Sequence, residues 1–430
     1  MSREGYRAVL DFATGQELDP EGIALDPRRI AAEGLDAVAR EGARLILQAA
    51  MEAEVNAFLG RMPYERAGTA RSGYRNGHRE RTLTCGSGSF PVEVPKITGA
   101  DAPFSIKSIR AYQRSSELIL KAIPLLYAEG LSTRDFERAL KPFWKEAGLS
   151  RSSISRANKQ LSAEFETWRR RDLSHLKVLY LFLDGVNERV RFGSCEKEGV
   201  LVAHAILEDG SRELLALELG PRETEDAWRE LLQGLASRGL RQPKLVVSDG
   251  APGLIKAVKE VWKGVPRQRC AAHKTRNVLG RVPRKHEKRV KRELVKIFHA
   301  SGLDAATRAA GAFFRKFRDE FPTACEVLAK DLDDCLTFFC FPETHWKRIR
   351  TSNVIERAFK EVRRRTKVVG RFPNERSAMT LIWASIEHDR LKWRGIHVDE
   401  TMLRVADQAR QSLAKKPIRV KSAREYLEAA

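Results

Sequence analysis

The hydrophobic residues in the first part of the chain recur mainly at helical spacing, with one β-rich interruption. From Arg29 to Leu59 apolar side chains return every three or four positions, which predicts a long amphipathic helix. Residues 1–28 lack such periodicity and are expected to form a loose arm. Residues 81–84 and 90–94 flank a Gly-Ser-Gly turn and predict a short hairpin.

Three helices are predicted between residues 114 and 166. The middle helix opens at residues 132–135, Ser-Thr-Arg-Asp, with the spacing of a capping box, and it ends near Gly148. The next helix begins at Ser150 and carries several Ser and Arg residues. Two helices joined by a short glycine-containing turn are typical of a helix-turn-helix, although proteins that never bind DNA also contain such pairs.

From residue 176 the pattern changes to that of a sheet with helices. Residues 176–183 form an apolar run that ends at Asp184, and residues 244–248 form another that ends at Asp249. Between these runs lie two β-rich segments and one helical segment, at residues 200–207, 213–219 and 225–235. Strands followed by a helix and another strand predict an α/β fold, in which helices flank a central sheet.

The last third of the chain is mostly helical. Residues 283–336 are helical and strongly basic, and a further helix is predicted from Asn353 to Val369, before Gly370. One side of this last helix is apolar and is expected to pack on the sheet, while the neighbouring side is basic and either faces phosphates or is solvated. The apolar side consists of Ile355, Phe359, Val362, Thr366 and Val369, and the basic side of Arg357, Lys360, Arg364 and Lys367.

The net charge of the chain predicts a polyanionic partner. The 430 residues include 78 Lys and Arg against 57 Asp and Glu, a formal net charge of +21. Cations that neutralise phosphates release counterions and strengthen nucleic-acid binding, although a generally basic soluble protein has the same composition. The length predicts two to four domains, and the six scattered cysteines indicate reduced thiols. We expect a soluble intracellular protein, because neither a signal peptide nor an apolar run of ~20 residues is present.

Three carboxylates are candidates for binding metal. Asp184 and Asp249 follow strands directly, which predicts that both lie at the rim of the sheet, and Glu356 lies on the last helix beside its apolar side. Hard cations such as Mg²⁺ prefer oxygen ligands, and two of them can promote phosphoryl transfer. Each position also has a structural interpretation, since Asp-Gly after a strand is an ordinary turn and Asn353 with Glu356 fits a capping box.

Longer motifs in the chain resemble one known family. They are YRNGHRERT at 74–82, EGLSTRD at 129–135, SDGAPGL at 248–254, QRCAAH at 268–273, HW at 345–346, RTSNVIER at 350–357 and RRRTKVVGRFP at 363–373. In order and spacing, over residues 71–396, the chain resembles the bacterial Mutator-type insertion-sequence transposases, which are Asp-Asp-Glu transposases.

The resemblance implies a ribonuclease-H-like catalytic core with an all-helical insertion, which would correspond to residues 283–336. The triad would be Asp184, Asp249 and Glu356, which would hold two Mg²⁺ ions per active site, with Mn²⁺ as a substitute. Glu188 and Asp209 are the alternative ligands if the first strand is shifted. Neither a nucleotide-binding P-loop nor a serine-nucleophile elbow occurs in the sequence, which argues against ATP-driven and serine-based chemistry.

Cys270 and His273 form the Cys-x-x-His pair of the same family. Two ligands at that spacing are only half of a zinc site, so we expect packing and hydrogen bonding near the active site instead. The residues that could complete a zinc site without forming a convincing second pair are Cys325, Cys335, Cys340, His286 and His345.

The residues predicted to contact DNA are mostly cations. Trp346 is added because aromatic side chains stack on bases, although an isolated Trp is more often a core residue. The candidates are Arg134, Arg151, Arg156, Lys274, Trp346, Arg350, Arg357, Lys360, Arg363, Arg364, Lys367 and Arg371.

The sequence therefore predicts a DNA transposase that binds the terminal inverted repeats of an insertion sequence and catalyses metal-dependent strand cleavage and strand transfer. Its partners would be double-stranded DNA and a second copy of the chain, in the bacterial cytoplasm and on the nucleoid when bound. A transposase-derived regulator without catalysis and a structure-specific nuclease are the alternatives. The predicted parts are residues 1–110 (arm, long helix and hairpin), 111–170 (helix-turn-helix), 171–275 (first part of the core), 276–345 (helical insertion), 346–400 (last part of the core, with the catalytic Glu) and 401–430 (helical tail).

Overall fold

The computed structural model describes most of the chain in two compact units, which are treated separately below. The described residues are 34–62, 73–85, 87–109, 151–188, 198–220, 224–366, 372, 374–390 and 395–429. The predicted arm, the helix-turn-helix up to residue 150 and the candidates Arg134, Lys367 and Arg371 lie outside these residues, as do the side chains of Arg151 and Arg156. The predicted domain boundaries stay a prediction.

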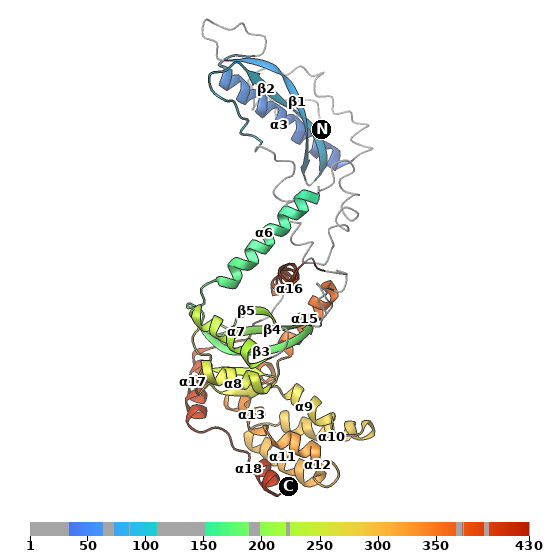
Figure 1. Cartoon of the computed structure of the whole chain (residues 1–430), viewed down its shortest axis with the longest axis vertical. Coiled ribbons are helices and arrows are strands. Elements are labelled where there is room, and N and C mark those ends of the chain that lie inside the picture. Colours follow the sequence, from blue (N-terminus) through green and yellow to red (C-terminus); the bar gives the residue numbers. More distant parts are fainter. Residues whose placement is uncertain are drawn as a thin grey trace, which may run out of the picture. The chain divides into compact units, whose positions relative to one another are not determined.

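The first unit packs one long helix against a hairpin (Figure 1). Helix α3 (Leu35–Leu59) contacts strand β2 (Gly88–Thr98), which pairs in antiparallel fashion with β1 (Tyr74–Cys85). Both predicted elements are confirmed, and the hairpin is longer than the sequence pattern indicated. Their small core consists of Met51, Leu83, Phe90, Val92 and Ile109.

The second unit is built on a mixed five-stranded sheet, which confirms the predicted α/β class. Its strand order is β5-β4-β3-β6-β7; β3 is antiparallel to β4 and parallel to β6, β4 is antiparallel to β5, and β6 is parallel to β7. The strands are β3 (Val178–Glu188), β4 (Glu198–Leu207), β5 (Arg212–Gly220), β6 (Leu245–Ser248) and β7 (Arg267–Arg269). The prediction that the first strand ends at Asp184 is wrong, because β3 continues to pair with β4 beyond it.

Both faces of this sheet are covered, and β3 divides its side chains between them. Tyr180 and Phe182 belong to one hydrophobic cluster, whereas Leu181 and Leu183 belong to the other, as the alternation of a strand requires. Helices α7 (Glu225–Ser237) and α8 (Pro252–Val261) contribute to the second cluster. The first cluster includes residues of α6 (Arg151–Arg170), α15 (Asn353–Thr366) and α16 (Glu375–Arg390).

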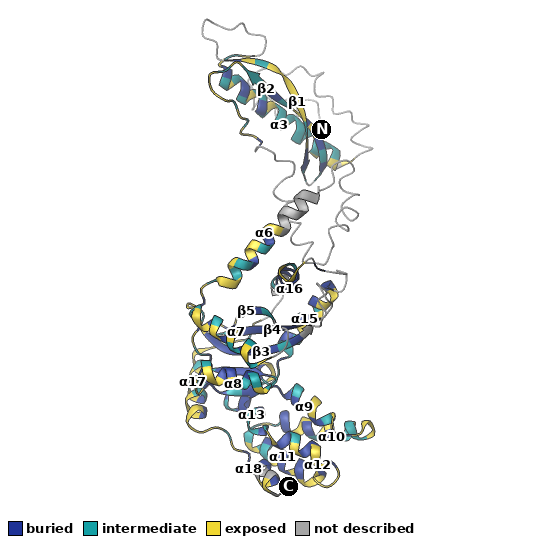
Figure 2. Cartoon of the chain, in the orientation of Figure 1, coloured by how far each residue is buried: buried dark blue, intermediate teal, exposed yellow. Residues whose placement is uncertain are grey.

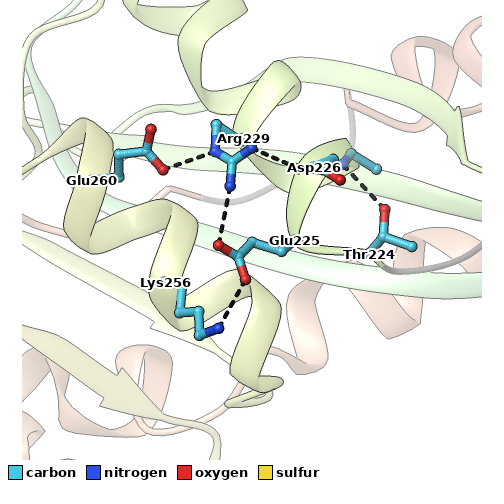
Figure 3. Close-up of polar contacts among 7 residues, drawn as sticks. Thr224, Glu225, Asp226, Arg229, Lys256 and Glu260 are labelled. Carbon is cyan, nitrogen blue, oxygen red and sulfur yellow. Dashed lines mark hydrogen bonds and ion pairs between the residues drawn. The ribbon is translucent and has the colours of Figure 1, made fainter.

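A polar network joins α7 to α8 at the surface (Figure 3). The guanidinium of Arg229 contacts carboxylates of Glu225, Asp226 and Glu260 at 3.0, 2.6 and 2.8 Å, and Lys256 pairs with Glu225 at 3.2 Å. Thr224 caps α7 by accepting a hydrogen bond from the backbone of Ala227. Surface ion pairs contribute only ~0–1 kcal/mol each, so the apolar contacts below them hold these helices together.

A group of helices follows β7, and residues 283–336 are helical as predicted. The helices of the remaining chain are α9 (Ala271–Leu279), α10 (Arg284–Phe298), α11 (Leu303–Phe317), α12 (Pro322–Ala329), α13 (Leu332–Cys335), η2 (Thr337–Cys340), η3 (Glu343–His345), α14 (Trp346–Ile349), α17 (Glu400–Lys415) and α18 (Lys421–Ala429). Helix α18 returns to this group (Figure 1). There the ring of Tyr426 stacks on that of Phe314, with the ring centroids 5.0 Å apart. Within the described residues, every helix is too short or too polar to span a membrane.

A buried amide joins the helical group to the sheet. The side chain of Gln268, on β7, is fully buried. Its nitrogen donates to the carbonyl oxygen of Cys335 at 2.9 Å, and its oxygen accepts a hydrogen bond from the backbone nitrogen of Phe338 at 2.7 Å. One side chain therefore satisfies two backbone groups that have no access to water.

The Gln268→Leu substitution should destabilise the second unit strongly. The leucine would leave the Cys335 carbonyl and the Phe338 N–H without partners, which costs roughly 2–4 kcal/mol. Urea unfolding followed by tryptophan fluorescence measures the change, with the exposed Gln233→Leu on α7 as control. Equal unfolding midpoints for the two variants would contradict the proposed role of this amide.

Candidate active site

The pairing of β3 with β6 brings the two predicted aspartates together. Leu183 lies opposite Ser248 in this parallel pair, so the next residues, Asp184 and Asp249, occupy neighbouring positions. Asp184 is only 4% exposed, whereas Asp249 is half-buried where the chain leaves β6. The two side chains therefore meet at the end of β6, although Asp184 itself lies within a longer strand.

The turn after Asp249 has a conformation that favours glycine. Gly250 has a φ of +83°, and the Asp249 carboxylate accepts a hydrogen bond from the backbone nitrogen of Ala251 at 3.0 Å. A Cβ atom at Gly250 would lie 1.6 Å from the guanidinium of Arg269. The glycine therefore permits both the left-handed turn and the close approach of Arg269 to the backbone.

Helix α15 brings the third carboxylate to the same region. Ile355, Phe359 and Val362 are buried and anchor the helix, as the predicted apolar stripe requires. Glu356 pairs with Arg276 of α9, and its Oε1 lies 3.7 Å from Nε2 of His273. The capping box considered for Asn353 and Glu356 is absent, because the Asn353 side-chain oxygen is buried without a hydrogen-bond partner among the described residues.

Ser352 connects these elements, and the sequence analysis did not identify it. The residue is fully buried, and its backbone nitrogen donates to Sγ of Cys270 at 3.3 Å. Its hydroxyl lies 3.5 Å from Nδ1 of His273. Ser352 precedes α15 directly, so these contacts link α9 to the helix that bears Glu356. Its place in the RTSNVIER motif was the available signal, but that motif does not reveal the partners.

Burial controls the protonation of this cluster. The pKa of Asp184 is raised to about 7, mainly by burial; the charges of Asp249 and Glu356 contribute to this rise, whereas His273 and Ser352 oppose it. The hydrogen bond with Cys270 raises the pKa of His273. Burial opposes ionisation of Cys270, but hydrogen bonds with His273 and Ser352 outweigh it and lower the pKa of the thiol. The cluster thus combines a carboxyl that resists ionisation with an imidazole that favours its charged form.

The carboxylate oxygens of Asp184, Asp249 and Glu356 suit a hard divalent cation, but the three side chains do not form one group. Among the described residues, no three His, Cys, Asp or Glu side chains are grouped closely enough to hold a metal ion. Asp184 and Asp249 are adjacent, whereas Glu356 is engaged by Arg276. A buried carboxyl with a raised pKa is a group whose ionisation a nearby cation would favour. The chemistry of the donors therefore fits metal binding.

The alternative ligands do not join this cluster. Asp209 lies in the turn between β4 and β5 and binds the backbone nitrogen of Ser211 at 2.8 Å. Because Leu207 pairs with Val178, that turn is at the opposite end of β3 from Asp184. The side chain of Glu188 lies outside the described residues.

Three of the residues predicted to contact DNA make contacts within the protein. Lys274 is 2% exposed and pairs with Asp331, so its ammonium does not reach the surface. Trp346 donates to the carbonyl of Phe341 at 2.8 Å and packs edge-on against Phe338 and Phe339. The half-buried guanidinium of Arg350 donates to the carbonyl of Phe298 at 2.9 Å. Lys274 is therefore enclosed by the protein, whereas Trp346 and Arg350 are half-buried and their contacts with DNA stay a prediction.

The basic side of α15 remains available at the surface. Arg357, Lys360 and Arg363 are exposed, and Arg364 is exposed while pairing with Glu361 at 3.0 Å. These positions lie on the same helix as Glu356, so they offer positive charge beside the carboxylate cluster.

Comparisons with known proteins agree on one family. The family model described as "Transposase, Mutator family" matches residues 21–395. The chain is 35% identical to the transposase for insertion sequence element ISRM5 of Rhizobium meliloti (strain 1021), over 84% of this chain and 91% of that protein. It is 34% identical to the transposase for IS406 of Burkholderia multivorans (strain ATCC 17616 / 249), over 84% and 92% respectively.

Among solved structures, the chain matches one described as a Drosophila P element transposase strand transfer complex. The match covers 76% of this chain and 94% of that chain, with 12% identity and a TM-score of 0.29. A TM-score this low does not establish a shared fold.

The Asp184→Asn substitution should flatten the dependence of stability on pH. The folded-state pKa of about 7 exceeds the ordinary value of 3.8, so the folded protein retains a proton that the unfolded chain loses. Stability therefore falls as pH rises from about 4 to 7, by an amount on the order of 2–4 kcal/mol. In EDTA the variant should match the unsubstituted protein near pH 4 and exceed its stability at pH 8.

Urea unfolding across this pH range measures the effect, and Mg²⁺ at pH 8 provides a second readout. The cation should stabilise the unsubstituted protein more than the variant. Parallel pH profiles for the two proteins would show that Asp184 does not carry the buried charge.

Proposed function

This chain belongs to the Mutator family of transposases, and from that premise we propose that Asp184, Asp249 and Glu356 form its divalent-metal site for cutting and joining DNA. The observation that carries the proposal is the register of β3 and β6, which sets Asp184 beside Asp249. Glu356 is the third ligand because its charge reaches Asp184 from the neighbouring helix.

A ribonuclease-H-like core is the fold we propose for the second unit. The mixed sheet supports it, since three antiparallel strands are extended by two parallel ones and the aspartates sit where β3 and β6 adjoin. Helices α9 to α13 follow β7 and precede α15, so they are our assignment for the all-helical insertion.

The three carboxylates would hold two Mg²⁺ ions, or Mn²⁺ in their place. Such a pair supplies activation of the attacking oxygen and stabilisation of the departing one. Asp184 and Asp249 would provide ligands from the sheet, and Glu356 would provide one from α15 on leaving Arg276. Ser352 would help to position this region, since it contacts Sγ of Cys270 and Nδ1 of His273 from the start of α15.

The proposed reaction has two phosphoryl-transfer steps. Water first attacks a phosphorus atom at the end of the element, the bond to the 3′ oxygen breaks, and that oxygen leaves as a hydroxyl. The new 3′ hydroxyl then attacks a phosphodiester of the target and displaces the target's own 3′ oxygen. The second step exchanges one phosphodiester for another, so it requires neither an external energy source nor a covalent enzyme intermediate.

DNA would be held by cations on the surface of the same unit. Arg357, Lys360 and Arg363 extend along α15 away from Glu356, where they can neutralise backbone phosphates. Recognition of the terminal inverted repeats would fall to residues 1–170. Pairing of two element ends calls for a homodimer or a larger assembly on DNA, which is part of the same proposal.

The Asp249→Asn and Glu356→Gln variants should each lose cleavage and strand transfer by roughly 100-fold or more. Loss of a direct ligand should exceed the 10–100-fold effect of outer-shell partners. The assay combines Mg²⁺, a target plasmid and labelled DNA from the ends of the element that surrounds the gene. The matched controls are Asp319→Asn and Glu400→Gln, whose side chains are 96% and 88% exposed.

Normal joining by either site variant would contradict the assignment of the triad. Tight end binding without cutting by the unsubstituted protein would favour a transposase-derived regulator. Cutting without joining, with a preference for junctions over terminal sequences, would favour a structure-specific nuclease.

A further inference from the structure

Helix α10 carries a basic surface that the proposed active site does not use. Five cations, Arg284, Lys285, Lys288, Lys291 and Arg292, are exposed along this helix and are called the α10 stripe below. The opposite side of α10 is buried through Val290, Leu294, Ile297 and Phe298, which fix the helix in the group that contains α9 and α11 (Figures 1 and 2). The helical period therefore directs the five cations to one outward arc.

The cations of the α10 stripe form no ion pairs like those of other cations on the same helix, although the charge of Lys285 helps to lower the pKa of nearby Glu320. Arg289 pairs with Glu320, and Lys296 pairs with Glu293 at 2.7 Å. None of the five stripe residues forms an ion pair with any described carboxylate, although the helix itself contains Glu287 and Glu293. Both acidic residues lie outside the exposed arc, since each is half-buried.

Like charges on the stripe are also close neighbours along the helix. Residues three or four apart share a helix face, and like charges at these spacings destabilise the helix. The pairs concerned are Arg284 with Lys288, Lys285 with Lys288, Lys288 with Lys291, and Lys288 with Arg292. The cations of the stripe therefore repel one another in the free protein, and a bound polyanion would reduce this repulsion.

We propose that the α10 stripe binds the phosphate backbone of duplex DNA without reading its sequence. Lys and Arg neutralise backbone phosphates, and contacts of this kind position a duplex without carrying sequence information. DNA is the polyanion here because the proposed function is the cutting and joining of DNA, on which this inference rests. The stripe would therefore hold DNA of any sequence, such as target or flanking DNA, while recognition of the element ends belongs to other residues.

The test compares two triple variants of the full chain that remove the same charge. The stripe variant carries Lys288→Gln, Lys291→Gln and Arg292→Gln, and the control carries Lys415→Gln, Lys416→Gln and Arg419→Gln at exposed positions near the C-terminus. Glutamine has nearly the helix propensity of lysine and arginine, so the α10 fold is retained. Binding of a labelled duplex of random sequence is measured between about 50 and 200 mM salt.

The stripe variant should show a slope of log K against log salt that is shallower by about 2–3, because each phosphate contact contributes ~0.9. Its thermal midpoint at low salt should rise by about 1–3 °C as the self-repulsion is removed, and the rise should vanish at high salt. The control variant should keep the slope and affinity of the unsubstituted protein. Unchanged binding by the stripe variant, or equal losses in both variants, would overturn the inference.

The strand-transfer assay separates this inference from the proposed function. With saturating DNA at low salt, the stripe variant should still join ends, because its carboxylates are intact. If the unsubstituted protein joins no ends but the stripe variant alone loses random-duplex binding, the proposed function fails and the inference stands. If joining is normal and the salt slopes are equal, the proposed function stands and the inference fails.

Discussion

The burial of one carboxyl group constrains the whole candidate active site. Asp184 is 4% exposed within β3, and its neighbours along that strand fill two separate apolar clusters. A charge in such a position is costly unless positive charge and hydrogen bonds surround it. Here the compensation is partial, since Ser352 and His273 favour ionisation while Asp249 and Glu356 oppose it. This balance is why the pKa of the Asp184 carboxyl is raised to about 7.

The groups around Asp184 come from four separate elements, and backbone hydrogen bonds hold those elements together. The backbone nitrogen of Cys270 donates to the carbonyl oxygen of Ser248 at 2.7 Å, which connects the start of α9 to the end of β6. The backbone nitrogen of Ala271 donates to the carbonyl oxygen of Arg350 at 3.0 Å, which connects α9 to the segment before α15. Cys270 and His273 thus act as a structural junction, and both contact Ser352 at the start of α15. These contacts give the Cys-x-x-His pair a role in packing and hydrogen bonding.

Charge is distributed unequally over the second unit. Around α7 and α8 the cations have carboxylate partners, as Arg229 illustrates (Figure 3). On the outer arc of α10 they form no ion pairs with described carboxylates, and on α15 Arg357 and Lys360 are exposed beside the carboxylate cluster. Cations paired with carboxylates are neutralised within the protein, whereas exposed cations without ion pairs attract a polyanion. The net charge of +21 is therefore informative only once its location is known.

The sequence alone determined the features that depend on neighbours within a few positions. Alternation and helical periodicity predicted β4, β5, α7 and the buried side of α15, and the motifs indicated the family. The apolar runs and the motifs also selected Asp184, Asp249 and Glu356 as candidates. Tertiary structure decided which cations are exposed: Lys274 and Arg350 carry the same charge as Arg357, yet they bind Asp331 and a backbone carbonyl inside the protein. It also decided the partners of Ser352 and Glu356, which lie 82 and 80 positions away at Cys270 and Arg276. Local periodicity does not encode contacts at such separations, because they arise only when sheet and helices pack against one another.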